Sequence, residues 1–542
     1  MNYWHIQMSL PEGSGGKHID SSELLREPSP VIGTGEWNNH QCSYFKDVIQ
    51  INDIICVKDG KAPIALCKVT SDCFKNPSLE AKYLHENFRQ VEILEFYNGA
   101  LDFPQHRGTL QIAKDENTDT WRFINNWLVS IKNKKAMEWI MKILKKKKQL
   151  ILQGPPGTGK TYTAKDIAEL LITNNISNDK KTQKKLLDGS GQFVLIQFHP
   201  AYTYEDFVRS LTAKSIDGQI EYVTENRIIA DFADKANKNL IAYRKDELEL
   251  SLEKKIEQLI AEFAEYVQDK IDQDDEYKIT DKVSIIGVEA DAFRYKGDWI
   301  VGQRMKFKDL VKAQLSGVSS RQEFKLVKDI SGLAVHHASY FFKVLTIFQE
   351  LYREALESNE TPDAEKPQLK NFVLIIDEIN RANLPAVLGE LIYALEYRGE
   401  SVNSMYSIDS DPTIIIPENL YIIGTMNTAD RSVGHIDYAI RRRFAFEKLL
   451  PNIDIIETDK GKQYFRVTED LFNNDNLSSD YKNSKDDVQI GHSYFMGDEG
   501  HLALRMKYEV IPILREYLKD GIFREETRDK IDQFESLVSA LF

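Results

Sequence analysis

Gly154-Pro155-Pro156-Gly157-Thr158-Gly159-Lys160-Thr161 lies between a short apolar segment, residues 149–152, and a helical pattern, residues 162–171. Glycines at these spacings let backbone N–H groups converge on phosphate oxygens, and the N-terminus of the following helix adds a favourable dipole. In such a loop Lys160 reaches the β- and γ-phosphates, and the Thr161 hydroxyl is a ligand for Mg²⁺. An ordinary glycine-rich turn is the alternative, and the flanking strand and helix disfavour it. The stretch therefore predicts a nucleoside triphosphate site in an α/β fold.

A second segment, more than two hundred residues downstream, has the features of a strand that ends in catalytic carboxylates. Residues 372–376 form a continuous β-branched and aliphatic run, which is typical of a strand buried on both faces of a parallel sheet. Asp377 at the end of this strand can support the Mg²⁺ ion, and Glu378 can polarise an attacking water. The alternative is an acidic pair that caps the next helix. Beside a phosphate loop, the pair predicts hydrolysis as well as binding.

A third apolar strand, residues 420–426, leads to Asn427, whose amide could orient the attacking water. Further along the chain, Arg441, Arg442 and Arg443 end a short helical pattern. Bidentate arginine contacts to a γ-phosphate accelerate hydrolysis strongly when a neighbouring subunit supplies them. For any one arginine the alternative is a solvated basic helix end. As a set, the arginines predict a ring in which one copy of the chain completes the site of the next.

The chain carries a phosphate loop, an Asp-Glu strand, an Asn-bearing strand and an arginine cluster, in that order. This order of segments resembles that of the AAA+ ATPases. Within that group, Met426-Asn427-Thr428-Ala429-Asp430-Arg431-Ser432 resembles the McrB subfamily, the motor subunit of modification-dependent restriction systems. Other stretches fit the same subfamily, namely residues 197–200, 202–207, 377–383 and 490–495. The resemblance covers roughly residues 135–230 and 335–520.

The resemblance implies roles for individual residues and for partners. Asn427 and Asp430 would position water and the neighbouring network, and Arg442 or Arg443 would act in trans, ahead of Arg441. Arg381 and Arg431 would be interface contacts. McrB-like motors typically use GTP with Mg²⁺, form hexamers and activate a separate nuclease, McrC. The residues alone leave GTP or ATP open, because none of them is identified as reading a guanine edge.

The domain plan follows from these positions. We expect an AAA+ α/β core over residues 126–450 with a helical insert at about 235–335, and a C-terminal helical lid over residues 451–542. Within the insert, residues 247–272 show apolar positions at helical spacing, and residues 283–288 and 299–301 are strand-like. A variable insert on the surface of the ring is favoured over a nucleic-acid or partner contact.

The first 125 residues contain several short strand patterns with polar turns, including residues 48–51, which suggests a small β-barrel. The run INDIICVKDGKAPIALCKV resembles the PUA-like domains that include EVE and YTH modules. Such modules extrude a modified base into an aromatic pocket. The candidate pocket walls are Trp4, Trp37, Tyr44 and Phe45, with Trp37 first because glycines and asparagines surround it. The alternative, that each aromatic fills the core of the barrel, is about as strong.

Composition limits the possible functions. The net charge of −14 argues against general coating of DNA, although Lys142–Lys148 is a local basic run. Neither a membrane span nor a signal peptide is recognisable, and Cys42, Cys56, Cys67 and Cys73 lack zinc spacing. We therefore expect a cytoplasmic protein with reduced cysteines and no membrane partner. No nuclease pattern is found, so cleavage of modified DNA would need an McrC-like partner.

Two other classes of function stay open. One is a protein-remodelling ATPase of the MoxR kind, which shares the phosphate loop and the Asp-Glu strand but is not expected to carry the Asn-Thr-Ala-Asp-Arg segment. The other is a sensor without cleavage activity, in which nucleotide binding switches a partner and the N-terminal domain reads RNA or DNA. Hydrolysis measured with and without a nuclease partner distinguishes the remodelling ATPase from a restriction motor. Binding to modified DNA or to RNA distinguishes the sensor from a restriction motor.

Overall fold

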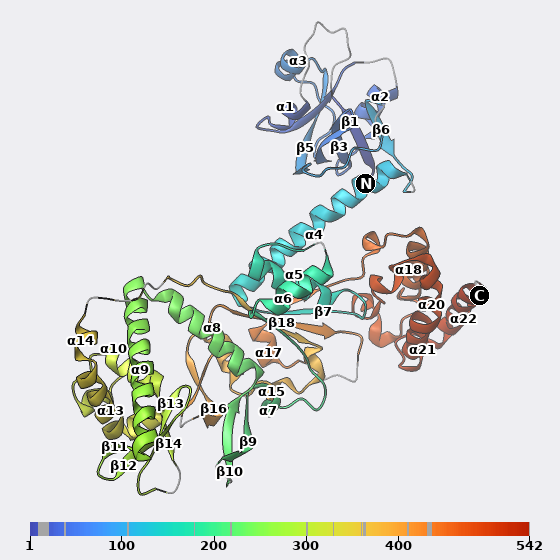
Figure 1. Ribbon diagram of the computed structural model, residues 1–542. Helices are drawn as coiled ribbons and strands as arrows, with labels where there is room; N and C mark the ends of the chain where they lie inside the picture. The colour runs from blue at the N-terminus through green and yellow to red at the C-terminus, as the bar shows by residue number, and fades with distance from the viewer. Residues whose placement is uncertain are drawn as a thin grey trace. The chain divides into compact units, whose positions relative to one another are not determined.

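The structure is a computed structural model of the chain (Figure 1). It describes residues 1–8, 21–36, 40–105, 108–116, 118–177, 179–216, 219–299, 302–328, 330–358, 360, 362, 365–408, 411–430 and 436–540. The chain forms two compact units. The first consists of Met1–Lys142, Pro451–Lys485 and Gln489–Phe542. The second consists of Ile143–Leu450 and Asp486–Val488, and it holds the phosphate loop and both strands that end in predicted catalytic residues.

The N-terminal part of the first unit is built on a six-stranded sheet with the order β2-β5-β4-β3-β1-β6. Its strands are β1 (Tyr3–Gln7), β2 (Val31–Thr34), β3 (Ile54–Asp59), β4 (Ala62–Val69), β5 (Asn87–Phe96) and β6 (Leu110–Ala113). Short helices α1 (Ser21–Leu25), α2 (His40–Ser43) and α3 (Pro77–Tyr83) accompany them. Because side chains alternate along a strand, Trp4 and Ile6 enter one hydrophobic cluster, and Tyr3 enters another on the opposite face.

One predicted strand of this domain is wrong. Of residues 48–51, Val48 ends a π-helical turn, Tyr44–Val48, and the next three residues do not join the sheet. The carboxylate of Asp53 explains the local fold, because it accepts hydrogen bonds from the backbone N–H of Gln50 at 3.1 Å and from the indole of Trp4 at 2.9 Å. A side chain that satisfies turn N–H groups competes with the ladder of a strand.

The second unit is built on a five-stranded parallel sheet with the order β19-β7-β18-β15-β8. Helix α4 (Asp119–Lys147) precedes it, and its strands are β7 (Gln149–Gly154), β8 (Phe193–Gln197), β15 (Phe372–Asp377), β18 (Leu420–Asn427) and β19 (Ala445–Lys448). Strand β18 lies between β7 and β15. The carboxyl ends of these neighbouring strands carry Gly154, Asn427 and Asp377, so the sheet brings the three predicted segments to one edge.

Helices and two β-hairpins complete the core around this sheet. The helices are α5 (Lys160–Thr173), α6 (Lys180–Gly189), α7 (Tyr204–Phe207), α8 (Ile228–Arg244), α15 (Leu384–Leu388), α16 (Leu391–Glu396) and α17 (Tyr438–Arg443). The hairpins are β9 (Arg209–Ile216) with β10 (Gln219–Asn226), and β16 (Ser401–Ile408) with β17 (Asp411–Ile415). The buried guanidinium of Arg209 joins the two hairpins, since it donates to the carbonyl oxygens of Tyr406 at 2.8 Å and Thr413 at 2.8 Å.

The insert between β8 and β15 is a mixed α/β structure with its own hydrophobic core, and not the helical insert that the sequence predicts. It begins with α9 (Glu247–Asp274), which confirms the long amphipathic helix. A four-stranded antiparallel sheet follows, formed by β11 (Tyr277–Thr280), β12 (Val283–Val288), β13 (Ala292–Lys296) and β14 (Gln303–Lys306). Trp299 lies outside these strands, and residues 300–301 are outside the described part.

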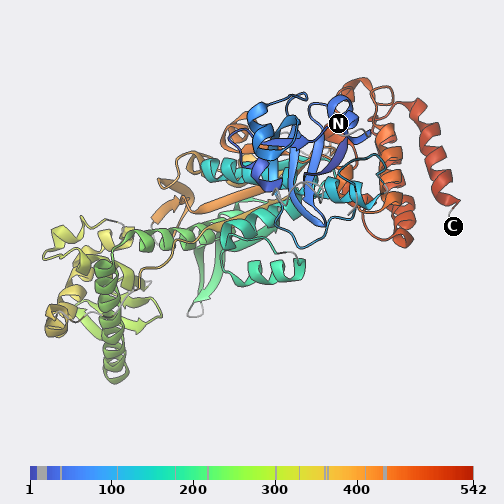
Figure 2. The same cartoon turned by 90° about the horizontal axis from the view of Figure 1, so that it is seen from above.

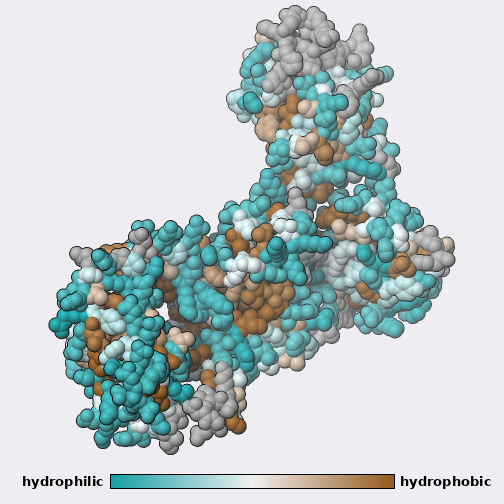
Figure 3. All heavy atoms as spheres, in the orientation of Figure 1, coloured by the Kyte–Doolittle hydropathy of each residue, from teal (hydrophilic) through white to brown (hydrophobic). Residues whose placement is uncertain are grey.

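Five further helices complete the insert, and α10 and α13 among them contact the small sheet: α10 (Phe307–Leu315), α11 (Arg321–Phe324), α12 (Gly332–His336), α13 (Ala338–Leu351) and α14 (Arg353–Glu357). In Figure 1 and Figure 2, helix α8 leads from the core into the insert. The partly buried His337 packs against Tyr295 in the insert, with its Nδ1 2.6 Å from the hydroxyl of Tyr295. Hydrophilic residues predominate over the face of the insert that Figure 3 shows, as expected for a solvated surface.

The C-terminal segment is helical, as predicted. Its main helices are α18 (Asp459–Leu471), α19 (Lys485–Val488), α20 (Glu499–Arg505), α21 (Ile511–Lys519) and α22 (Arg528–Ser539). A short 3₁₀ helix, His492–Phe495, contains the buried His492. None of the helices in the described ranges has both the length and the apolar character that crossing a bilayer would require.

Candidate nucleotide site

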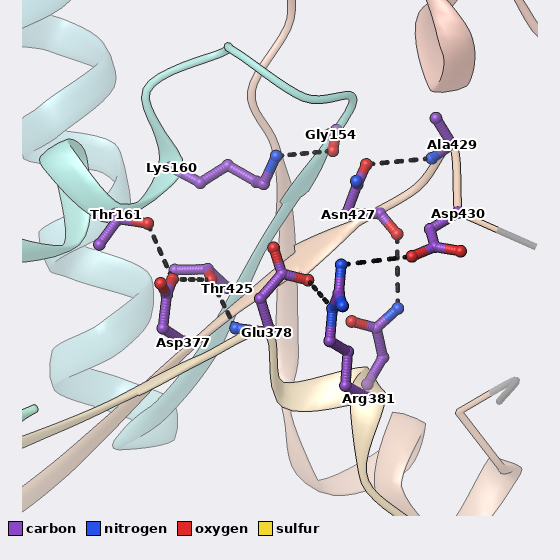
Figure 4. Close-up of polar contacts among 11 residues, drawn as sticks. Gly154, Lys160, Thr161, Asp377, Glu378, Arg381, Thr425, Asn427, Ala429 and Asp430 are labelled. Atoms are coloured by element: carbon purple, nitrogen blue, oxygen red, sulfur yellow. Dashed lines mark hydrogen bonds and ion pairs between the residues drawn. The ribbon is translucent and has the colours of Figure 1, made fainter. Parts of the chain in front are cut away.

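The phosphate loop connects β7 to α5 and has the conformation that its glycines predict. Gly157 and Gly159 have φ values of 80° and 78°, which only glycine adopts without strain. A Cβ atom on Gly154 would collide with the carbonyl oxygen of Leu449. The ammonium group of Lys160 folds onto the loop and donates to the carbonyl oxygens of Gly154 at 2.9 Å and Pro155 at 2.8 Å (Figure 4). The loop therefore holds its lysine at the position where phosphates would bind.

The hydroxyl of Thr161 and the carboxylate of Asp377 meet although 216 positions separate them. Thr161 Oγ1 donates to Asp377 Oδ1 at 2.8 Å, and Thr425 Oγ1 donates to the same oxygen at 2.5 Å. Magnesium is usually held by one or two protein oxygens together with substrate phosphates. The Thr161 and Asp377 oxygens fit that requirement, because they are neighbours beside the phosphate loop.

Glu378 occupies a constrained position directly after β15. Its backbone is left-handed, with φ 52° and ψ 45°, which is uncommon for a residue with a Cβ. The N–H of Glu378 donates to Thr425 Oγ1 at 3.1 Å, and its carboxylate accepts from Arg381 Nε at 3.2 Å. Strained backbone of this kind concentrates at functional sites, where the surrounding structure holds it. The carboxylate is thereby directed to the same edge of the sheet as Lys160 (Figure 4).

Asn427, Asp430 and Arg381 form the other side of the site. The Arg381 guanidinium also contacts Asp430 Oδ2 at 3.4 Å, so it bridges two predicted catalytic carboxylates. Asn427 Oδ1 accepts the N–H of Ala429 at 3.2 Å, and Asn380 Nδ2 donates to the Asn427 carbonyl at 3.4 Å. Arg381, predicted as an interface contact, thus has two partners within its own chain. Arg431, the other predicted interface residue, lies outside the described residues.

These groups surround a cavity of about 250 Å³. Its lining combines the phosphate loop with the ends of β15 and β18 and consists of Pro156, Gly157, Gly159, Lys160, Thr161, Tyr162, Glu378, Thr425 and Asn427. Sequence reasoning missed Thr425, which contacts both Asp377 and Glu378. The available signal was a polar residue inside an otherwise apolar strand.

The three arginines at the end of α17 have different environments. The Arg442 side chain is 68% exposed and contacts Glu396 at 3.1 Å. The Arg443 side chain is only 10% exposed and contacts the same carboxylate at 2.8 Å. The Arg441 guanidinium lies 5.4 Å from the centre of the Phe446 ring and donates to the Ile436 carbonyl. Of the two arginines predicted to act in trans, Arg442 has the more exposed side chain.

The candidate base-reading aromatics do not form a common pocket in the described part of the chain. Trp4 and Phe45 have no exposed surface and belong to the hydrophobic core of the N-terminal sheet, so they cannot be pocket walls. Tyr44 is 38% exposed, and its ring contacts Trp4 edge-on at 6.1 Å. Trp37 lies outside the described residues. Trp4 and Phe45 thus differ from Tyr44 in their burial, which the neighbouring residues in the sequence do not specify.

Lys160 provides a pH prediction. Burial lowers its pKa to about 8, and the charges of Glu378 and Asp377 only partly oppose that shift. Phosphates favour the charged ammonium, so above pH 8 binding must also take up a proton, and affinity should fall by up to about tenfold per pH unit. The measurement is the Kd of a fluorescent nucleotide between pH 7 and 9. Lys184→Met, at an exposed position on α6, should keep the wild-type profile, whereas a constant wild-type Kd would contradict the prediction.

Comparison with known proteins finds family models that match part of the core and part of the C-terminal helical segment. Residues 345–444 match the model for the AAA domain of the dynein-related subfamily, and residues 474–525 match the model for the alpha-helical lid domain of McrB. The chain is 36% identical over 185 residues to the Type IV methyl-directed restriction enzyme EcoKMcrB subunit of Escherichia coli (strain K12), covering 30% of this chain and 40% of that protein.

A second relative is the Type II restriction enzyme BsuMI component YdiS of Bacillus subtilis (strain 168), 37% identical over 98 residues, or 16% of this chain and 28% of that protein. The chain therefore aligns with less than half the length of either relative. Among solved structures, human THYN1 in complex with 5-methylcytosine-containing DNA is similar over 23% of this chain and 95% of that chain, with 11% identity and a TM-score of 0.18. Within this chain, residues 345–444 are therefore similar to an AAA domain, and residues 474–525 are similar to the helical lid domain of McrB.

Proposed function

We propose that this chain hydrolyses a nucleoside triphosphate, GTP in preference to ATP, and that the work drives a separate McrC-like nuclease that cleaves modified DNA. The observation that carries the proposal is the cavity in which Lys160, Thr161, Glu378 and Asn427 meet. A phosphate-binding lysine and a strained carboxylate at one edge of a parallel sheet are the parts that phosphoryl transfer to water requires.

Each side chain has a role that follows from its position. The phosphate loop and Lys160 bind the β- and γ-phosphates, and Thr161 and Asp377 hold Mg²⁺, which when bound neutralises phosphate charge. Glu378 accepts the proton of the attacking water as its oxygen approaches the γ-phosphorus. Asn427 orients that water, while Asp430 and Arg381 fix the carboxylate of Glu378.

We propose that the active form is a homo-oligomeric ring, a hexamer by likeness to McrB-type motors. Support comes from Arg442, which is absent from the lining of the cavity of its own chain yet presents an exposed guanidinium. A guanidinium supplied by a neighbour can stabilise the charge that develops on the γ-phosphate. In this arrangement each site consists of the phosphate loop of one copy and Arg442 of the next.

The N-terminal domain is proposed to select modified DNA. Support comes from its sequence resemblance to PUA-like modules and from the half-exposed ring of Tyr44. Anisotropy measurements with the full chain, using matched methylated and unmodified DNA duplexes and an RNA strand, test this part. Equal affinity for the two duplexes would contradict it, and preference for RNA would favour the sensor class.

The central test is steady-state hydrolysis of GTP and of ATP by the purified chain, with and without the protein encoded beside it. We expect GTP turnover that the neighbour stimulates, together with cleavage of modified DNA only when both proteins are present. ATP turnover that is indifferent to a nuclease partner would overturn the restriction function and favour protein remodelling of the MoxR kind.

A further inference from the structure

A buried amide joins the first residue of the phosphate-loop strand to the end of the arginine helix. Gln149 begins β7 and is 3% exposed. Its Nε2 donates to the carbonyl oxygen of Leu395 at 3.0 Å and to that of Arg443 at 2.8 Å. Leu395 lies in the last turn of α16, and Arg443 is the last residue of α17. One side chain thus satisfies two helix-end carbonyl groups that have no partner within their helices.

The orientation of this amide is set by Arg398. The Arg398 guanidinium donates to Gln149 Oε1 from Nε at 3.1 Å and from Nη2 at 2.7 Å. Its Nη1 donates to the carbonyl oxygens of Pro417 at 3.0 Å and Leu420 at 2.5 Å. Because a guanidinium only donates, it holds Oε1 toward itself and leaves Nε2 to face Leu395 and Arg443. Burial lowers the pKa of Arg398 to about 9, so the group stays charged at neutral pH.

The side chains of α17 are anchored to the same neighbour. The Glu396 carboxylate, at the end of α16, contacts both Arg442 and Arg443. The backbone end of α17 is therefore held by Gln149, and the guanidinium groups of Arg442 and Arg443 are held by Glu396, the residue next to Leu395. Two independent anchors fix the direction in which the exposed Arg442 leaves the surface.

We propose that Gln149 and Arg398 are positioning residues that aim Arg442 at the nucleotide of the neighbouring copy. This inference rests on the trans role of Arg442 proposed above. Gln149 starts the strand that ends at Gly154, so its effect on its own site must be separated from its effect on the neighbour. A displacement of about 1 Å in a group that contacts the transition state can cost about 10²-fold in rate.

The test replaces Gln149 by methionine, which has similar length but neither donates nor accepts like an amide. We expect kcat of the full chain to fall by about 10²-fold while nucleotide KM stays near the wild-type value. Gln149→Glu is the second variant. It keeps an acceptor for Arg398 but removes the donor to Leu395 and Arg443, and it should show the same loss of kcat if Gln149→Met does not fold.

Complementation then identifies which site is affected. Each variant is mixed with Glu378→Gln, whose own site is inactive but whose Arg442 is intact. A Gln149 variant beside a Glu378→Gln copy receives a correctly placed arginine, so the mixture should recover turnover that neither protein shows alone. Arg442→Ala mixed with Glu378→Gln is the positive control and should recover in the same way.

The possible results are distinct. Recovery in both mixtures supports the positioning role. Recovery with Arg442→Ala but not with the Gln149 variants would overturn it and would show that Gln149 serves its own phosphate loop, with the trans site left standing. Failure of both mixtures, with assembly confirmed by sedimentation, would overturn the trans site itself.

Discussion

Glu378→Gln is expected to bind nucleotide and assemble like the wild-type chain while kcat falls by about 10²–10⁴-fold, the usual contribution of a general base. Glutamine preserves the size of the side chain and can still accept the hydrogen bond from Arg381 at the position of Oε2. It cannot take a proton from water. The change therefore removes the chemical step without emptying the site.

The measurement is steady-state turnover together with nucleotide affinity for the same preparation. Glu400→Gln is the matched control, since Glu400 is an exposed glutamate that follows α16, outside the cavity lining. It should retain wild-type kcat. Normal turnover by Glu378→Gln would assign the base to another group, and loss of nucleotide binding would show that Glu378 is needed for the structure of the site.

Arg442→Ala is expected to lower kcat by about 10³–10⁵-fold without weakening nucleotide binding, because an arginine supplied in trans stabilises the transition state more than the bound substrate. The structure distinguishes the members of the cluster. Arg443→Ala should lower the melting temperature instead. The Arg443 side chain is only 10% exposed, and its loss removes a largely buried partner of the Glu396 carboxylate. Arg441→Ala should have the smallest effect on kcat.

Turnover, affinity and thermal melting of the three alanine variants, measured in parallel, give the comparison. Equal losses of kcat for Arg441→Ala and Arg442→Ala would contradict a specific trans contact and favour a general electrostatic effect. Unchanged turnover in Arg442→Ala with a large loss in Arg443→Ala would transfer the role to Arg443, whose guanidinium would then have to leave Glu396 on assembly.

Arg381 contacts both the Glu378 carboxylate and the segment that resembles the McrB subfamily. In this structure Arg381 pairs with Glu378, three positions before it, and with Asp430, 49 positions after it. Arg381 thus joins the carboxylate proposed as the general base to the segment that resembles the McrB subfamily.

The sequence was sufficient for features that are contiguous. A phosphate loop is recognisable because one turn supplies its glycines, lysine and threonine. Strands β7, β15 and β18 are recognisable because each contains at least three consecutive apolar residues. The long helix α9 follows from apolar residues at helical spacing. These signals survive without tertiary information because the physical cause lies within a few residues.

Predictions that depended on burial were weaker. Trp4 and Phe45 were candidates for a binding pocket, and packing places both in the core. Of the small sheet in the insert, residues 283–288 were predicted to be strand-like and form β12, but β11, β13 and β14 were missed. These three strands are four or five residues long, and β13 and β14 carry charged positions such as Arg294 and Arg304. Short strands gain their stability from pairing with neighbours, so their own sequence contains little of the signal.

By itself the sequence determined where the glycine-rich loop and its lysine lie and which strands carry carboxylate and amide groups, because those properties are local. The tertiary structure decided how they combine. Thr161 meets Asp377 across 216 positions, and Gln149 reaches Arg443 across 294. It also decided which arginine is exposed and which is buried. Distance along the chain carries no information on such contacts, since they arise only when the parallel sheet places the ends of distant strands side by side.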